Sequence, residues 1–132
     1  MIAGAINAHY EATVRLSVQG ADGRVQEIEA ILDTGFNGSL TLPSTVIANL
    51  GLTWRTRGLI MLANGSEDQC DIYAATIIWD GTRRNILVEA ADTDPLIGMA
   101  LLYGHNTVRL EVVEGGSVII EALPNPFKGG LA

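Results

Sequence analysis

The chain has 132 residues, of which 48% are hydrophobic and 17% are charged, enough apolar material for one core but with no room for a second domain. Its 8 basic and 15 acidic residues give a net charge of −7, which repels phosphate backbones and anionic membrane surfaces, so neither nucleic acid nor a membrane is an expected partner. We expect a single domain over residues 1–132, with its core within residues 10–122 and a C-terminal tail over residues 123–132.

Cysteine usage and hydropathy further limit the class of protein to which the chain can belong. Cys70 is the single cysteine, so it forms no intrachain disulfide and has no second thiol with which to build a zinc site. The N-terminal apolar stretch is short and has no basic residue ahead of it, unlike a signal peptide. No segment approaches the roughly 18 uninterrupted apolar residues of a membrane span. These features predict a cytoplasmic protein.

The first elements in chain order are two strands joined as a hairpin. Residues 14–18 alternate between apolar and polar side chains, a period of two that indicates a half-buried strand. Residues 20–23 contain two glycines and break the pattern, and residues 25–32 resume it. The second strand runs directly into Asp33.

A short strand over residues 39–42 is followed by a helix that begins near Pro43 and is closed by Gly51 in the left-handed conformation. Two longer strands are then predicted over residues 54–62 and 67–79. Asn64-Gly65 between them is a strong hairpin signal, because a type I′ turn needs positive φ at both central residues.

The remaining elements follow Asp80-Gly81, a further turn. They are a strand over residues 84–89, a helix of about two turns over residues 99–103, and a last hairpin of residues 107–113 and 117–122. Many short strands, glycine-rich turns and two brief helices predict an all-β, barrel-like domain.

The segment that carries chemistry is Asp33-Thr34-Gly35. An apolar strand that ends in a carboxylate brings a charge toward a low-dielectric place, where it needs a partner or hydrogen bonds. Thr34 supplies a hydroxyl, and Gly35 allows close approach of another backbone. On these three residues alone, an aspartate that caps its own loop is the better interpretation.

Three further features fall in order behind this motif: a hairpin tip, a second apolar motif and a short helix. The Asn64-Gly65 hairpin tip lies 31 residues after Asp33, and Leu96-Ile97-Gly98 precedes the second helix. The combination resembles the retropepsin family of aspartic proteases, and Asp-Thr-Gly-Phe followed by Gly38 and Leu-Thr-Leu-Pro is similar to a bacterial branch of it. The resemblance implies a closed β-barrel of the acid protease fold, an aspartic endopeptidase activity and a homodimer.

The resemblance assigns roles around the motif. Asp33 would be the catalytic carboxylate, Thr34 would lock the two active-site loops together across the dimer, and Gly35 would leave space for the substrate backbone. Phe36 departs from the family, which usually has a small residue there. Its ring is expected to line a substrate pocket or to lie against the core, with Leu62, Ile86 and Leu101 as further pocket candidates.

The resemblance also assigns roles to the hairpin and to the second apolar motif. The tip formed by Ala63, Asn64, Gly65 and Ser66 would be the flap that closes over a peptide. Leu96-Ile97-Gly98 would form the apolar loop that supports the active-site strand. For each of these features, an ordinary surface turn or strand end is the alternative.

The mechanism implied by the resemblance needs two carboxyl groups that share one proton. No other aspartate in the chain is followed by Thr-Gly or Ser-Gly, so the second carboxyl must come from another copy of the chain. Such a site needs no metal and no organic cofactor, and it binds peptide as an extended strand. Two alternatives remain open: a retropepsin-fold module that binds peptide or dimerises without turnover, and an unrelated small β-barrel.

Overall fold

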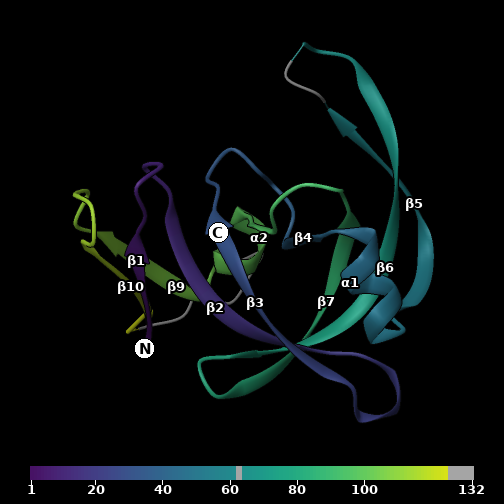
Figure 1. Cartoon of the computed structure of the whole chain (residues 1–132), viewed down its shortest axis with the longest axis horizontal. Helices are drawn as coiled ribbons and strands as arrows, with labels where there is room; N and C mark the ends of the chain where they lie inside the picture. The colour runs from purple at the N-terminus through teal and green to yellow at the C-terminus, as the bar shows by residue number, and fades with distance from the viewer. Residues whose placement is uncertain (62–63, 125–132) are drawn as a thin grey trace.

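The computed structural model describes residues 1–61 and 64–124 (Figure 1). In this part of the chain the elements are β1 Ile2–Ile6, β2 Ala12–Gln19, the 3-10 turn η1 Ala21–Gly23, β3 Val25–Leu32, β4 Leu40–Leu42, α1 Ser44–Leu50, β5 Thr53–Met61, β6 Glu67–Trp79, β7 Thr82–Ala90, β8 Leu96–Ile97, α2 Met99–Leu102, β9 Asn106–Leu110 and β10 Ser117–Ala122. The prediction of a mainly β chain with two brief helices is confirmed.

The strands form one sheet that bends back on itself. Its order is β5-β6-β7-β4-β8-β3-β2-β1-β10-β9, and an additional pairing joins β6 to β2, with Val18 opposite Ile77. Strand pairing therefore runs in a circuit from β6 through β7, β4, β8, β3 and β2 back to β6. Two parallel pairs, β3 with β8 and β4 with β7, lie within this circuit, which brings distant segments of the chain beside the end of β3.

Two arms extend from the circuit. In Figure 1 the β5–β6 hairpin rises from the body at the upper right, while β1, β9 and β10 lie on the opposite side. The loop between β3 and β4 lies between these two parts in the same view. Asp33 belongs to that loop, so both arms flank the predicted active-site motif.

The core fills the inside of the circuit. Its fully buried side chains come from most of the strands and from both helices: Leu40, Leu42, Leu50, Ile77, Ile97, Leu101, Ile120, Val14, Val18, Val88 and Val118. The alternation read from the sequence reports these faces correctly. On β7, for example, Ile86 and Val88 are buried and Leu87 between them is 52% exposed.

The predicted turns and helix cap are confirmed in most places. Asp80 and Gly81 have φ of 52° and 78°, the positive pair that a type I′ turn requires, and they join β6 to β7 as a two-residue loop. Gly51 ends α1 with φ of 61°. Its amide donates to the carbonyl oxygen of Ala48, which satisfies one of the free carbonyls at the end of the helix.

The turn at Asn64-Gly65 differs from the two-residue turn that the dipeptide favours. Met61 pairs with Glu67, so the connection between β5 and β6 takes residues 62–66. The side-chain oxygen of Asn64 accepts from the amide and the hydroxyl of Ser66, at 2.9 and 2.6 Å. This local bond stabilises a wider loop, because an Asx turn competes with the tight turn.

Two predicted boundaries are wrong. The second helix is one turn, Met99–Leu102, because Tyr103 leaves the helical region with ψ of 125° and starts the passage into β9. Strand β9 ends at Leu110 rather than Val113. Beyond it, the amide of Glu111 still donates to the carbonyl of Ser117, but Val113 donates to the carbonyl of Glu111 and Gly116 to that of Val113, so the backbone turns.

The N-terminal segment forms β1, which pairs within the same chain. It pairs with β10, with Ile2 opposite Ile120, and with β2, with Ala5 opposite Thr13. The C-terminal tail predicted over residues 123–132 lies largely outside the described residues. Within the described ranges, no helix has the length and apolar character needed to cross a membrane.

Candidate active site

Asp33 is the first residue after β3, and the backbone around it is anchored. Its amide donates to the carbonyl oxygen of Ile97 at 2.9 Å, and its own carbonyl accepts from the amide of Phe36 at 3.1 Å. The side-chain Oδ1 accepts from the amide of Gly35 at 2.9 Å. This bond holds the carboxyl in one direction. Asp33 is half-buried, so its carboxyl is still open to solvent.

Thr34 and Gly35 are both exposed at the tip of this loop. The hydroxyl of Thr34 makes no hydrogen bond within residues 1–61 and 64–124, so it is free to bond outside the chain. A Cβ on Gly35 would lie 3.2 Å from Oδ1 of Asp33, closer than most real Cβ contacts. Glycine at this position keeps the face of the carboxyl uncovered.

Leu96, Ile97 and Gly98 lie directly beside the Asp33 loop. Ile31 and Leu32 pair in parallel with Leu96 and Ile97, which extends the sheet up to the motif. The amide of Gly98 donates to the carbonyl of Ser39 at 3.1 Å. The two apolar segments predicted from the sequence to act together are thus in contact, although 60 or more residues separate them.

The start of α2 binds the other end of the loop. The amide of Met99 donates to the carbonyl of Phe36 at 2.8 Å, and the amide of Ala100 donates to that of Gly38 at 3.1 Å. The first amides of a helix have no partner within it, so these two bonds satisfy groups that would otherwise be free. Sequence reasoning missed this role of α2, because it depends on the β3–β8 pairing.

The ring of Phe36 is half-buried and lies over two glycines. Ring atoms lie 2.5 Å from the position of a Cβ on Gly38 and 2.6 Å from that on Gly98. The larger side chain after the Asp-Thr-Gly motif is therefore accommodated by small residues, and the backbone bonds of Phe36 to Asp33 and Met99 are intact. Of the other pocket candidates, Ile86 and Leu101 belong to the core, and Leu62 lies outside the described residues.

A pocket of about 570 Å³ opens next to Asp33 and Thr34. Its walls come from β1, the turn after it, β3, α2 and β9, and they are mainly apolar. Several of the large hydrophobic side chains around it are exposed to solvent: Tyr10, Met99, Tyr103, Val108, Leu110 and Val112. Sequence reasoning missed this apolar surface, although the alternation of Val108, Leu110 and Val112 is a signal of a one-sided apolar strand.

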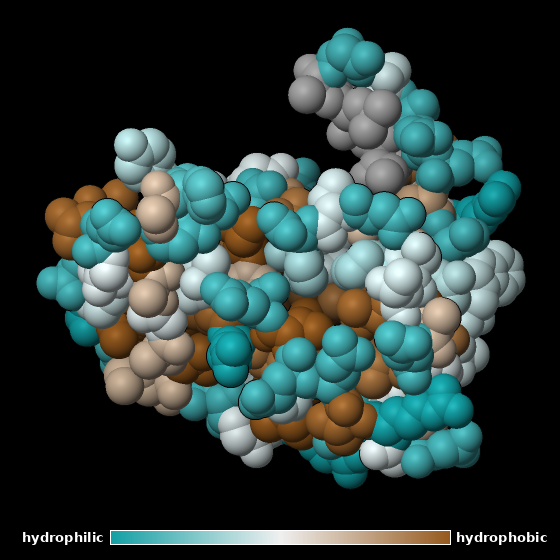
Figure 2. Space-filling view, viewed as in Figure 1, coloured by the Kyte–Doolittle hydropathy of each residue, from teal (hydrophilic) through white to brown (hydrophobic). Residues whose placement is uncertain are grey.

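The hairpin expected to act as a flap stands away from the loop. Asn64, Gly65 and Ser66 are exposed, and none of them makes a hydrogen bond with the Asp33 loop. Ala63 lies outside the described residues. Figure 2 shows the hairpin as a narrow arm that projects from the body and is mainly hydrophilic in its described part.

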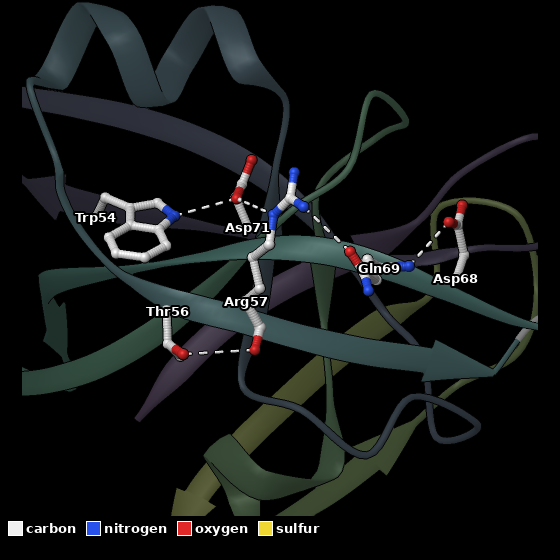
Figure 3. Close-up of polar contacts among 6 residues, drawn as sticks. All are labelled: Trp54, Thr56, Arg57, Asp68, Gln69 and Asp71. Carbon is white, nitrogen blue, oxygen red and sulfur yellow. Dashed lines mark hydrogen bonds and ion pairs between the residues drawn. The ribbon is translucent and has the colours of Figure 1, made fainter.

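Polar side chains join the two strands of this arm (Figure 3). Oδ1 of Asp71 accepts from the indole nitrogen of Trp54 at 3.1 Å and from Nε of Arg57 at 3.4 Å, and Arg57 also donates to Gln69. Because these groups are exposed, each bond contributes little to stability. Together they hold β5 to β6 beyond the point where the arm leaves the body.

Within the described ranges, no cluster of three or more histidine, cysteine, aspartate or glutamate side chains is placed to hold a metal ion. Glu89 on β7 is a half-buried carboxylate near the Phe36–Gly38 segment, and burial raises its pKa above the usual value. The sequence offered no signal for it, since a glutamate in an alternating strand is most often a solvated residue.

Comparison with known proteins supports the fold. By sequence, the chain matches no family model and no curated protein. By structure, it is similar to a retropepsin-like aspartic protease from Rickettsia conorii, with a TM-score of 0.57 and 17% identity over 92% of this chain and 90% of that chain. A simian foamy virus protease matches 64% of this chain and 86% of its own, with 20% identity and a TM-score of 0.44. The fold of the chain is retropepsin-like.

Proposed function

We propose that the chain is an aspartic endopeptidase that acts as a homodimer, with Asp33 of each copy supplying one catalytic carboxyl. The observation that carries this proposal is the setting of Asp33. It lies at the end of β3, is anchored to Ile97 and Gly35, and faces an apolar pocket in a retropepsin-like fold. A loop aspartate that merely capped its own turn would not need the bonds from β8 and α2 that fix this segment.

The chemistry requires two carboxyl groups in different protonation states. An ionised carboxylate takes a proton from water while the protonated one donates to the scissile carbonyl oxygen, which gives a tetrahedral diol. Proton transfer to the amide nitrogen then breaks the carbon–nitrogen bond and releases an acid and an amine. Two carboxyls about 3 Å apart share a single proton. Two symmetry-related copies of one aspartate can therefore supply both the ionised and the protonated carboxyl.

The second copy must approach on the side where Thr34 is exposed. The apolar surface formed by Tyr10, Val108, Leu110 and Val112 adjoins the same pocket, and side chains of this size are rarely left exposed together on a monomer. Association through this surface would cover it and bring the two Asp33 loops together. Thr34 would then bond across the axis.

In the dimer the β5–β6 arm would act as the flap. It projects from the body on the opposite side of the Asp33 loop from β1, β9 and β10, and Asn64, Gly65 and Ser66 near its tip make no bond to the rest of the body (Figure 1). An extended peptide between the arm and the loop would bond through its main chain. The Leu96–Gly98 segment and α2 would hold the loop in place beneath it.

The test compares the wild-type protein with Asp33→Asn, which preserves shape and removes the ionisable group. Cleavage of a diverse peptide library between pH 4 and 7 should occur with the wild type, be blocked by pepstatin and be lost in Asp33→Asn. Sedimentation should show that both proteins dimerise. Specific activity should rise with protein concentration, because only the dimer has two carboxyls.

Two outcomes would reject the proposal in different ways. A wild-type dimer that cleaves no peptide would leave the chain as a peptide-binding or dimerisation module. A stable monomer that cleaves, or an assembly in which the Asp33 carboxyls stay far apart, would remove the shared site itself.

A further inference from the structure

Glu89 lies on β7, between β6 and β4, beside the segment that follows the Asp-Thr-Gly motif. In the strand register it is opposite Ile72 of β6 on one side and Thr41 of β4 on the other. Successive residues of a strand point to opposite faces, so Glu89 shares its face with Ile72, and not with the buried Val88. It therefore projects from the strand away from the core.

The carboxylate reaches the segment that follows the Asp-Thr-Gly motif. Its Oε1 lies 3.0 Å from the position that a Cβ on Gly38 would occupy, and atoms of the Phe36 ring lie 2.5 and 2.7 Å from the same position. An acidic oxygen and an aromatic ring thus lie side by side against Gly38. A side chain at position 38 would collide with both groups, so glycine allows this close approach.

No group within residues 1–61 and 64–124 neutralises this charge. Glu89 has no hydrogen bond and no ion pair, although it is half-buried, and desolvation raises its pKa. Its carboxylate also raises the pKa of the Cys70 thiol, after the larger effect of that residue's burial. Arg57, a cation of the arm, is already bonded to Asp71 and Gln69.

We propose that Glu89 is a specificity residue that receives an arginine or lysine side chain of a peptide bound between the flap arm and the Asp33 loop. This inference rests on the proposed endopeptidase function. The guanidinium group of arginine suits this pair of groups, because it bonds to carboxylates through a planar fork and stacks on aromatic rings. An unpaired, partly desolvated carboxylate gains more from such a partner than an exposed one does.

The test uses a set of fluorogenic peptides with one apolar sequence, in which arginine or norleucine stands at each position in turn. At one position of the peptide, the ratio of the wild-type kcat/KM for arginine to that for norleucine should be about ten or more. Glu89→Gln should bring this ratio toward one, and Glu89→Arg should favour an aspartate-containing peptide instead. Glu27→Gln, which removes an exposed carboxylate on β3, should leave the ratio as in the wild type.

A second measurement separates this inference from the endopeptidase proposal. Binding of the same labelled peptides to Asp33→Asn is followed by fluorescence anisotropy, with and without Glu89→Gln. If no peptide is cleaved but the arginine peptide binds more tightly only when Glu89 is present, the specificity role stands and the catalytic proposal fails. If arginine and norleucine peptides bind and react alike, and Glu89→Gln changes neither ratio, the specificity role is wrong.

Discussion

The amide of Asp33 donates a hydrogen bond to the carbonyl oxygen of Ile97, across 2.9 Å and 64 positions of the chain. This bond continues the parallel pairing of β3 with β8 by one residue beyond the end of the strand. It fixes the start of the candidate catalytic loop to a fully buried residue. Several consequences of this connection can be measured.

Replacement of Gly98 by alanine should destabilise the protein strongly. Its Cβ would lie 2.1 Å from the carbonyl oxygen of Gly38 and 2.7 Å from that of Phe36, and backbone atoms so placed cannot move without breaking the loop. We expect a loss of about 3 kcal/mol in the free energy of unfolding. Denaturant unfolding of the wild type and Gly98→Ala measures this difference.

Gly115→Ala is the matched control for that substitution. Gly115 has φ of 75° but nothing within 4 Å of its Cβ position, so alanine there meets backbone strain without a collision. A loss of about 1 kcal/mol is expected. Equal losses in the two variants would show that the contact between Gly98 and the Phe36–Gly38 segment has no special importance.

The hydroxyl of Thr41 should be needed to position β8. Its oxygen accepts from the amide of Leu96 at 2.9 Å, and Thr41 is only 5% exposed. Thr41→Val keeps the shape and leaves that amide without an acceptor, which should cost about 1–3 kcal/mol. Thr76→Val, which removes an exposed bond to Asn85, should cost less than about 1 kcal/mol in the same unfolding experiment.

Glu89 and Asp92 should affect the pH dependence of stability with opposite signs. Burial raises the pKa of Glu89 in the folded state, so the unfolded state releases this proton first and stability falls as pH rises through the two pKa values. Glu89→Gln should therefore raise Tm at pH 7 relative to the wild type and lose this advantage near pH 3. A thermal melt at each pH measures the difference.

Asp92 provides the comparison. Its Oδ1 accepts from the amide and the hydroxyl of Ser44 at the start of α1, and these bonds lower its pKa. The stability it contributes is present above the pKa of the unfolded state and is lost as pH falls through that of the folded state. Asp92→Asn should lower Tm at pH 7 and have little effect at acidic pH. If both variants shift Tm in the same direction at pH 7, this assignment is incorrect.

Charge placed on the apolar surface beside Asp33 should prevent dimerisation. Leu110 is 43% exposed and lines the pocket, so Leu110→Lys would have to desolvate an ammonium group on association. We expect at least about a tenfold rise in the dimer dissociation constant and a parallel loss of activity at low concentration. Analytical ultracentrifugation and the peptide assay measure the two effects.

Val25→Lys is the control for that variant. Val25 is 55% exposed at the start of β3 and does not line the pocket, so a lysine there should leave both association and activity unchanged. A dimer that tolerates Leu110→Lys as well as Val25→Lys would place the interface on another face of the molecule.

The sequence by itself determined those features that depend on local conformational preference and periodicity. Apolar alternation located most of the strands, and Asp80-Gly81 and Gly51 set a tight turn and a helix end because few residues adopt positive φ. The Asp33-Thr34-Gly35 motif, followed by Leu96-Ile97-Gly98, indicated the retropepsin-like fold.

The tertiary structure alone decided which residues far apart in the sequence come into contact. Asp92 caps α1 from 48 residues away, α2 binds the carbonyls of Phe36 and Gly38, and Glu89 faces Gly38 from a different strand. The sequence alone could not predict these contacts, because each depends on the order of strands in the sheet and on which parallel pairs form. That order is set by how the whole apolar core is buried at once, a property that no single segment carries.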